Sequence, residues 1–266
     1  MEYHFKKSVL LRLSFRIEKY FWLALPIILV ILIWEGACFW GLVNNTLFPP
    51  PWKVAVSLWT MLSDGSLISD ILASLWRVIF GLIIGSAIGI ILGIATGRSK
   101  KIAKIISPLI HILRPLPPVA IIPLIIVWLG IGDVAKIFSI SFAVFFPVWI
   151  SAHIGSERIP STYLWSARFL TASKLKVFFK LILPSSLPFI MSGIRTGVAM
   201  AFIMVFVSEL AGASQGLGYR ISISEWVYRI DDVMASLIVL ALLCAVVDQL
   251  FIYLSNKVWP WIKLNR

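Results

Sequence analysis

Residues 71–97 read ILASLWRVIFGLIIGSAIGIILGIATG, an apolar stretch that carries a single charge, Arg77. A stretch of this length can cross a bilayer as one helix. Positions four apart share a helix face, and small residues there let a second helix approach closely. The stretch therefore predicts a membrane-spanning helix with a packing face, which a neighbouring helix either holds or slides along. That face carries a glycine at every fourth position: Gly81, Gly85, Gly89, Gly93 and Gly97.

The composition of the whole chain agrees with a membrane protein. Of the 266 residues, 60% are hydrophobic and only 14% are charged, and the mean hydropathy is +0.96. Soluble domains average about 25% charged residues, so lipid is the expected surrounding. In a soluble protein the net charge of +12 would suggest nucleic acid. Here it is explained by membrane topology, and no nucleic-acid partner is expected.

Six apolar segments are each close to, or longer than, the roughly 20 residues that cross a bilayer as a helix. Helices satisfy their own backbone groups in lipid, so we predict one all-α polytopic domain with six transmembrane helices. The expected plan is a basic N-terminal segment (1–19), the six-helix domain (20–258) and a tail (259–266). The six segments are residues 20–40, 71–97, 105–129, 134–155, 189–211 and 233–258.

The distribution of lysine and arginine predicts the orientation. With the N-terminus in the cytoplasm, 17 of the 24 Lys and Arg residues fall on the inner side and four fall in outer loops, namely Lys53, Lys136, Arg220 and Arg229. Cytoplasmic loops carry the excess of these residues, so both termini are predicted to be cytoplasmic. The localisation expected is a bacterial inner membrane, crossed several times.

Residue patterns for catalysis or metal binding are missing from the sequence. It contains no phosphate-binding loop, no H-E-x-x-H and no G-x-S-x-G motif. Cys38 and Cys244 lie in apolar segments without disulfide or metal spacing. His111 and His153 stand alone, which favours packing residues. We therefore expect no enzyme activity, cofactor or metal in this chain. The first segment lacks a clear cleavage site, so a cleaved signal peptide is not expected.

Charges inside apolar segments are costly and usually face a bundle interior or a cavity. The candidates are Glu35, Arg77, Arg114, Arg195, Glu209 and Asp248. Arg195 and Glu209 cannot pair with each other, because 14 residues span about 21 Å along a helix. Matched depths instead predict the pairs Arg77–Glu209 and Arg195–Asp248. They serve either as structural bridges or as part of the translocation path.

The segment 156–188 lies between the fourth and fifth apolar segments and contains WSARFLTASKLKVFFKLILPSSLP at 165–188. It is basic and helical in pattern, too polar for lipid and too ordered in pattern for a slack loop. We predict a docking element on the cytoplasmic face. Proline lacks an N–H and disfavours helix at the residue before it, so Pro184 and Pro188 are expected to separate this element from the fifth span.

The docking segment resembles the loop of the permease subunits of binding-protein-dependent ABC importers. The motif of that family is E-A-A-x-x-x-G, nine residues, then I-x-L-P. Trp165, Ser166 and Ala167 occupy the E-A-A positions, Thr171 the glycine position, and residues 181–184 the LILP ending. The subgroup resembled imports sulfonates, taurine, nitrate and bicarbonate, and the resemblance leaves a pyrimidine or vitamin precursor such as a flavin open as substrate. The same resemblance covers residues 47–51 (LFPPP), 116–118 (LPP), 121–124 (IIPL), 128–132 (WLGIG), 192–195 (SGIR) and 208–219 (SELAGASQGLGY).

The resemblance implies a type I importer fold and two permease copies, expected as a homodimer. ATP and Mg would sit on separate ATPase subunits, and an extracytoplasmic binding protein would deliver a small solute near Asp64, Asp70 and 212–232. A short coupling helix at 166–176 would dock on the ATPase. The docking residues implied are Trp165, Ser166, Ala167, Arg168, Thr171, Ala172, Ser173, Lys174 and Pro184.

Two departures from the motif leave alternatives open. Trp165 replaces a glutamate and offers a large apolar face with one N–H donor, while Thr171 replaces a glycine that could adopt positive φ. Either the ATPase groove is more apolar, or this chain couples weakly or as half of a heterodimer. A secondary transporter driven by an ion gradient is the alternative function, although the inverted repeats common in that class are not evident.

Overall fold

The computed structural model describes residues 25–171 and 173–261, and their regular elements are all helical. Predictions for residues 1–24, for Ala172 and for residues 262–266 lie outside this part of the chain. The elements in order are a helix at Leu25–Phe39, α2 (Pro51–Ser63), α3 (Ser66–Arg98), α4 (Lys100–Leu113), the 3-10 turn η1 (Pro118–Ile121), α5 (Ile122–Leu129), α6 (Asp133–Glu157), α7 (Ser161–Leu170), α8 (Lys174–Val177), the π turn η2 (Phe178–Ile182), α9 (Leu183–Leu210), α10 (Leu217–Trp226) and α11 (Ile230–Val258).

Four helices are long and apolar enough to cross a membrane: α3, α6, the continuous stretch Lys174–Leu210, and α11. The third apolar segment, residues 105–129, is not one straight helix. Two helical pieces, Lys100–Leu113 and Pro118–Leu129, meet there at 86°. Pro115, Pro117 and Pro118 cause the break, because each removes a backbone donor and restricts the residue before it.

The stretch Lys174–Leu210 corrects a prediction. Pro184 and Pro188 were expected to interrupt the chain before the fifth span, yet the helix runs through both of them. A π turn lies just before Pro184 and accounts for the continuity there, since the Leu183 N–H bonds to the Phe178 carbonyl, five residues back. A widened turn shifts the hydrogen-bond register by one residue. The helix therefore continues although proline has no N–H to donate.

The glycines of α3 pack directly on α6. A Cβ added at Gly85 would lie 2.5 Å from the Ser141 carbonyl oxygen, and one at Gly93 would lie 2.7 Å from that of Trp149. Separations this short leave no room for a side chain, so the two backbones touch. Helices in lipid associate through such van der Waals packing. The face predicted from the four-residue spacing is thus a packing seam along α3.

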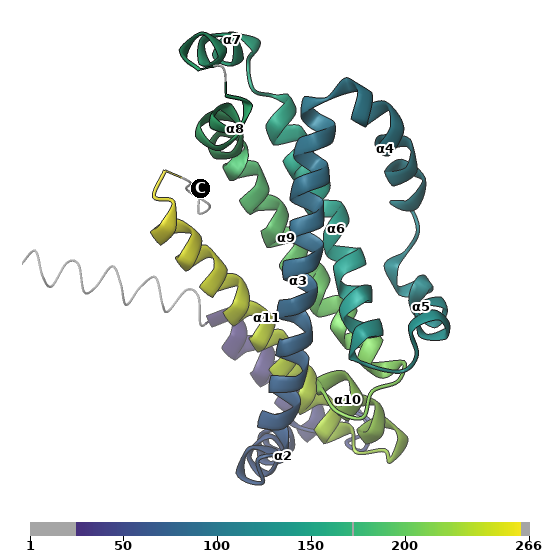
Figure 1. Ribbon diagram of the computed structural model, residues 1–266. Coiled ribbons are helices and arrows are strands. Elements are labelled where there is room, and N and C mark those ends of the chain that lie inside the picture. The colour runs from purple at the N-terminus through teal and green to yellow at the C-terminus, as the bar shows by residue number, and fades with distance from the viewer. Residues whose placement is uncertain (1–24, 172, 262–266) are drawn as a thin grey trace, which may run out of the picture.

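Helix α6 is the centre of the bundle, because α9 packs on it as well. A Cβ on Gly193 would lie 3.0 Å from the Pro147 carbonyl oxygen. Buried Val144, Val148 and Val198 fill the core where α3, α6 and α9 meet. Figure 1 shows α11 on one side of this core and the bent α4–α5 segment on the other. It also shows α7 at one end of the molecule, called the α7 end below, and α2 and α10 at the opposite, α10 end.

Candidate functional site

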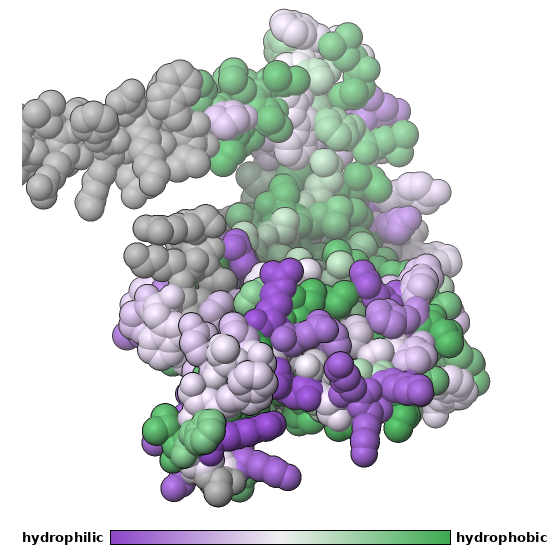
Figure 2. Space-filling view, turned by 90° about the horizontal axis from the view of Figure 1, so that it is seen from above, coloured by the Kyte–Doolittle hydropathy of each residue, from purple (hydrophilic) through white to green (hydrophobic). Residues whose placement is uncertain are grey.

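The α7 end carries a dense group of hydrophilic side chains. Figure 2 looks down on this end and shows them spread over the surface nearest the viewer. Exposed basic residues contribute from three elements: Lys100, Lys101 and Lys104 of α4, Arg168 of α7, and Lys174 and Lys176 of α8. This surface belongs to the segments predicted to be cytoplasmic.

Helix α7 carries apolar side chains on its outward face as well as on the face that packs against the protein. Its inner side chain Leu164 is buried against Ile159 and Val177, which holds α7 on α8. Its outer face presents Trp165, 59% exposed, and Phe169, 93% exposed. These two residues are four apart and therefore share one helix face. Large aromatic side chains are thus displayed outward at a polar end of the molecule.

Two hydroxyl groups bond to the backbone where α7 ends and α8 begins. Thr171 adopts φ −157° and ψ 135°, its Oγ1 accepts a bond from the Ser173 N–H, and the Ser173 Oγ accepts one from the Lys176 N–H. The coupling segment 166–176 therefore comprises the end of α7, which stops at Leu170, and the start of α8 at Lys174. An extended conformation suits a β-branched residue, so Thr171 occupies the motif's glycine position without strain.

A concave surface, called the cradle below, lies between α7 and α8. It encloses about 570 Å³. Its lining combines apolar side chains with the two lysines Lys176 and Lys180. Among the predicted docking residues, Ser166, Ala167 and Thr171 line this cradle, Arg168 and Lys174 are exposed nearby, and Pro184 lies inside the following helix. The full lining is Tyr163, Ser166, Ala167, Leu170, Thr171, Lys176, Val177, Lys180 and Leu181.

At the α10 end, the structure brings Arg77 and Glu209 together as the matched depths predict. Arg77 Nη1 donates to Glu209 Oε1 at 2.6 Å, and both side chains are buried. Arg77 Nε also donates to Asp133 at 2.8 Å, and Nη1 to the Gln215 carbonyl at 2.7 Å. One guanidinium therefore joins α3 to the start of α6, the end of α9 and the loop before α10.

The first N–H groups of α10 are capped by side chains from other helices. Gly216 N–H donates to Asp70, Leu217 N–H to Ser74 and Gly218 N–H to Glu209, each at 2.9 Å. The first N–H groups of a helix have no intrahelical partners. Carboxylates at this position are also stabilised by the helix dipole. A Cβ at Gly216, whose φ is +129°, would lie 2.5 Å from the Glu209 carboxylate. Glycine is therefore required at this contact.

The two acids predicted to lie at the outer surface differ in environment. Asp64 is exposed, and hydrogen bonds from the Ser66 hydroxyl and N–H lower the pKa of its carboxyl. Asp70 is instead buried and paired with Arg220 at 2.5 Å, so it is not available to a partner. Lys136, assigned to an outer loop, is likewise buried within α6.

Sequence reasoning missed Asp133, Ser74 and the structural role of Asp70. A signal for two of them was present, because Asp70, Ser74 and Arg77 follow the helical spacing of four and three that puts residues on one face. That face continues directly into the glycines from Gly81 onward. A polar stripe leading into a glycine seam on an otherwise apolar helix marks a buried contact along its whole length.

The second predicted pair, Arg195 with Asp248, also meets. The guanidinium binds the carboxylate in a bidentate manner, with Nε–Oδ1 at 2.9 Å and Nη2–Oδ2 at 3.1 Å. The side chains are 40% and 25% exposed, so this pair is more open than the Arg77–Glu209 pair. It connects α9 to α11. Arg114, a further candidate, is exposed at the end of α4, because the chain bends there.

The lone histidines pack on an aromatic residue. His153 stacks on Trp149, and its Nδ1 lies 2.9 Å from Thr96 Oγ1. His111 meets the same tryptophan edge-on. Both histidines thus have the packing environment expected of them.

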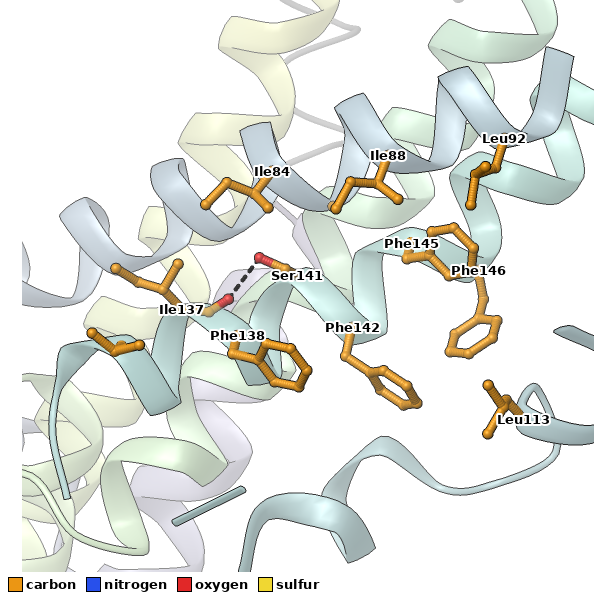
Figure 3. A pocket seen from close by; sticks show the side chains of 12 residues that line it. Ile84, Ile88, Leu92, Leu113, Ile137, Phe138, Ser141, Phe142, Phe145 and Phe146 are labelled. Atoms are coloured by element: carbon orange, nitrogen blue, oxygen red, sulfur yellow. Dashed lines mark hydrogen bonds between the residues drawn. The ribbon is translucent and has the colours of Figure 1, made fainter. Parts of the chain in front are cut away.

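An apolar cavity of about 530 Å³ lies between α3 and α6 and reaches Leu113. Figure 3 shows Phe138, Phe142 and Phe146 projecting from α6 toward Leu113, with Ile84 and Ile88 on α3 beside them. Ser141 is the polar side chain of the lining, and its hydroxyl is bonded to the Ile137 carbonyl of its own helix at 2.7 Å. The lining offers no cation or spare donor for a charged solute.

Solved structures share this fold. A chain of the MetNI methionine ABC transporter in an inward-facing conformation aligns with a TM-score of 0.56 at 18% identity, covering 78% of this chain and 96% of that one. An amino acid ABC transporter structure aligns with a TM-score of 0.57 at 18% identity, covering 77% and 96%. These likenesses concern the arrangement of the helices.

Sequence relatives extend over most of the chain. The taurine transport system permease protein TauC of Escherichia coli K12 is 31% identical over 234 residues, covering 86% of this chain and 85% of TauC. A Bacillus subtilis protein named for aliphatic sulfonates transport, SsuC, is 31% identical over 247 residues, covering 92% and 89%. The family described as "Binding-protein-dependent transport system inner membrane component" matches residues 85–260. The chain therefore belongs to this family and is the membrane-spanning permease subunit of an ABC transporter.

Proposed function

We propose that this permease imports a small organosulfonate and receives its driving force from a separate ATPase through α7 and α8. One observation carries the coupling role. Trp165, Phe169 and Leu170 are 59%, 93% and 87% exposed on a helix that is surrounded by basic residues at a polar end of the molecule. Contiguous exposed apolar surface marks an interaction site, and aromatic residues dominate binding energy at interfaces.

The path from the docking element into the membrane is short. Helix α8 continues through the π turn into α9 without a break, so a force on α8 acts on α9 as on a single rod. Helix α9 packs closely on α6 at Gly193, and α6 packs on α3 along the glycine seam. Movement of packed rigid elements is a known route for such switching, and ATPase closure would re-pack these helices between inward- and outward-open states.

The proposed topology has six spans: the helix Leu25–Phe39, α3, the bent pair α4–α5, α6, the stretch Lys174–Leu210, and α11. Both termini would be cytoplasmic, with the α7 end facing the cytoplasm. The basic residues of α4, α7 and α8 at that end support this orientation through the positive-inside preference.

The proposed substrate class rests on the relatives named for taurine and aliphatic sulfonates. A sulfonate is an anion, and the phenylalanine-lined cavity in Figure 3 is a poor site for it because the lining carries no cation. Burying an uncompensated charge among apolar groups is costly. We therefore assign sulfonate passage to the path between two permease copies rather than to this cavity.

The remaining partners follow from the family. Two identical permease copies would enclose the path, and two ATPases would carry ATP and Mg at the α7 end. An extracytoplasmic binding protein would dock at the α10 end, where Asp64 and the side chains of Trp226 and Tyr228 are exposed. In this arrangement Trp165, Ser166, Ala167, Arg168 and Lys174 belong to the ATPase contact.

Transport by reconstituted vesicles tests the function. Vesicles that hold the permease, its ATPase and its binding protein should accumulate labelled taurine only when ATP is present on the ATPase side. Accumulation by the permease alone under an ion gradient would instead support a secondary transporter. A second test isolates coupling: Trp165→Ala with Phe169→Ala should abolish ATPase association, whereas normal association by this variant would contradict the docking role.

A further inference from the structure

From α7 onward the proposed docking element carries charge of one sign only, since the one acid of segment 156–188 is Glu157, the last residue of α6. Residues 158–208 contain no aspartate or glutamate, while residues 158–188 contain five basic residues, Arg158, Arg168, Lys174, Lys176 and Lys180. The resembled motif carries an acid at the position of Trp165, so here the acidic group has been lost from the docking element. Electrostatic complementarity orders an interface, and an entirely basic element needs an acidic partner.

The cradle gives this charge a defined place. Lys176 and Lys180 are four residues apart on consecutive turns, and both line the cradle and are exposed. Neither forms an ion pair with any residue in 25–171 or 173–261. The same lining includes the apolar side chains of Ala167, Leu170 and Val177, of which Val177 is buried. Two ammonium groups and several apolar side chains in one lining suit a side chain with an apolar stem and a carboxylate head.

The charge pattern discriminates among occupants. A second copy of this chain presents the same basic segment, so copy-to-copy contact here would place like charges together. The rigid connection of the cradle to α9 favours a partner that transmits force, which a lipid headgroup does not. The aromatic pair Trp165 and Phe169 also lies on the adjoining helix, so one partner protein can engage both features.

We propose that the cradle receives a carboxylate-bearing, otherwise apolar element of the ATPase subunit, whose glutamate or aspartate pairs with Lys176 and Lys180. This rests on the proposed function, and it specifies the polarity of the contact. The permease supplies the cations and the ATPase supplies the anion, while Trp165 and Phe169 enter an apolar part of the same groove.

The experiment uses the purified complex of the permease and its ATPase in nanodiscs of phosphatidylcholine. Treatment with a carbodiimide should join Lys176 or Lys180 to an ATPase carboxylate, detected by mass spectrometry. The variant Lys176→Glu with Lys180→Glu should weaken ATPase association at least about tenfold. The matched control Lys100→Glu with Lys101→Glu makes the same charge change at exposed positions of α4 and should retain wild-type affinity within a factor of about two.

Charge exchange makes the test specific. Changing the cross-linked ATPase carboxylate to lysine should restore association to the double glutamate variant and weaken association with the wild type. If the wild type does not bind the ATPase at all, the proposed function fails. If Trp165→Ala weakens binding but the lysine variant binds normally, only the carboxylate inference is overturned. The inference is also overturned if the lysine changes affect only binding to discs that contain anionic phosphatidylglycerol.

Discussion

The two ends of the molecule treat their charges in opposite ways. At the α10 end, Arg77 and Glu209 are buried and bonded to side chains and backbone of the same chain. At the α7 end, Lys176 and Lys180 are exposed, as are the aromatic side chains of Trp165 and Phe169. The buried ion pair of the α10 end is satisfied within a single chain, whereas these lysines form no ion pair among the described residues. The difference separates residues that maintain the fold from residues that we propose recognise a partner.

The strongest test of this contrast is removal of Glu209. Glu209→Ala should lower the free energy of unfolding by about 3–5 kcal/mol, because it leaves the buried Arg77 guanidinium short of a counter-ion. Unfolding in mixed detergent micelles measures the loss. The control is Glu225→Ala at the same end, where the carboxylate is exposed and the change should be small. Equal effects at both positions would break the contrast.

The next largest effect is expected at the α7 end, on binding rather than on stability. Trp165→Ala should weaken ATPase association by about 2–4 kcal/mol, as loss of a central aromatic anchor does, while the melting temperature stays near that of the wild type. Titration of the ATPase onto permease nanodiscs gives the affinity. Trp226→Ala removes a still more exposed tryptophan from the α10 end and should leave ATPase affinity unchanged. If Trp165→Ala lowered the melting temperature, the α7 end would also contribute to the stability of the fold.

The glycine seam connects the two ends, and a methyl group should disturb it. Gly85→Ala should cost about 1–3 kcal/mol of stability, since overpacking forces backbones apart. The added Cβ would lie 2.5 Å from the Ser141 carbonyl oxygen, whereas at Gly36 it would lie 3.9 Å from the nearest side-chain atom. Gly36→Ala is therefore the control, and the same unfolding assay compares them. Similar stability of the two variants would argue against a tight seam.

The smallest expected effect concerns the Arg195–Asp248 pair. Its groups are partly exposed, so they lie between the buried Arg77–Glu209 pair and the exposed lysines of the α7 end. A double-mutant cycle with Arg195→Ala and Asp248→Ala should give a coupling energy of about 1 kcal/mol, in the range of polar contacts between membrane helices. Additive effects of the two substitutions would show that the bidentate contact contributes nothing to stability. A larger coupling would move this pair toward the behaviour of Arg77 and Glu209.

Several features of the fold were predictable because they depend on spacing alone. The seam on α3 follows from five glycines at intervals of four, which any helix places on one face. The Arg77–Glu209 and Arg195–Asp248 contacts follow from depth, since helices crossing one bilayer bring residues of equal depth to the same level. The role of Asp133 did not follow, because an acid at the start of a helix is equally explained by the helix dipole.

Other features depend on hydrogen-bond register, which composition does not reveal. Pro184 looked like a helix break, yet the π turn before it keeps the helix continuous. The prolines at 115, 117 and 118 have the same chemistry but bend the chain by 86°. Thr171 looked like a loss of freedom at a glycine position, but its backbone there is extended. Residue type limits the allowed dihedral angles, whereas the neighbouring contacts select among them.

The ion pairs of Arg77 also have a consequence for how the protein is made. During synthesis the arginine emerges 56 residues before Asp133 and 132 residues before Glu209. At about 5–20 residues per second, the wait for Glu209 is on the order of 10 s. An unpaired arginine is costly inside a bilayer, so α3 must remain near the insertion machinery, or extend this side chain to the water interface, until α9 arrives. Assembly of the α10 end is thus a late event in biogenesis.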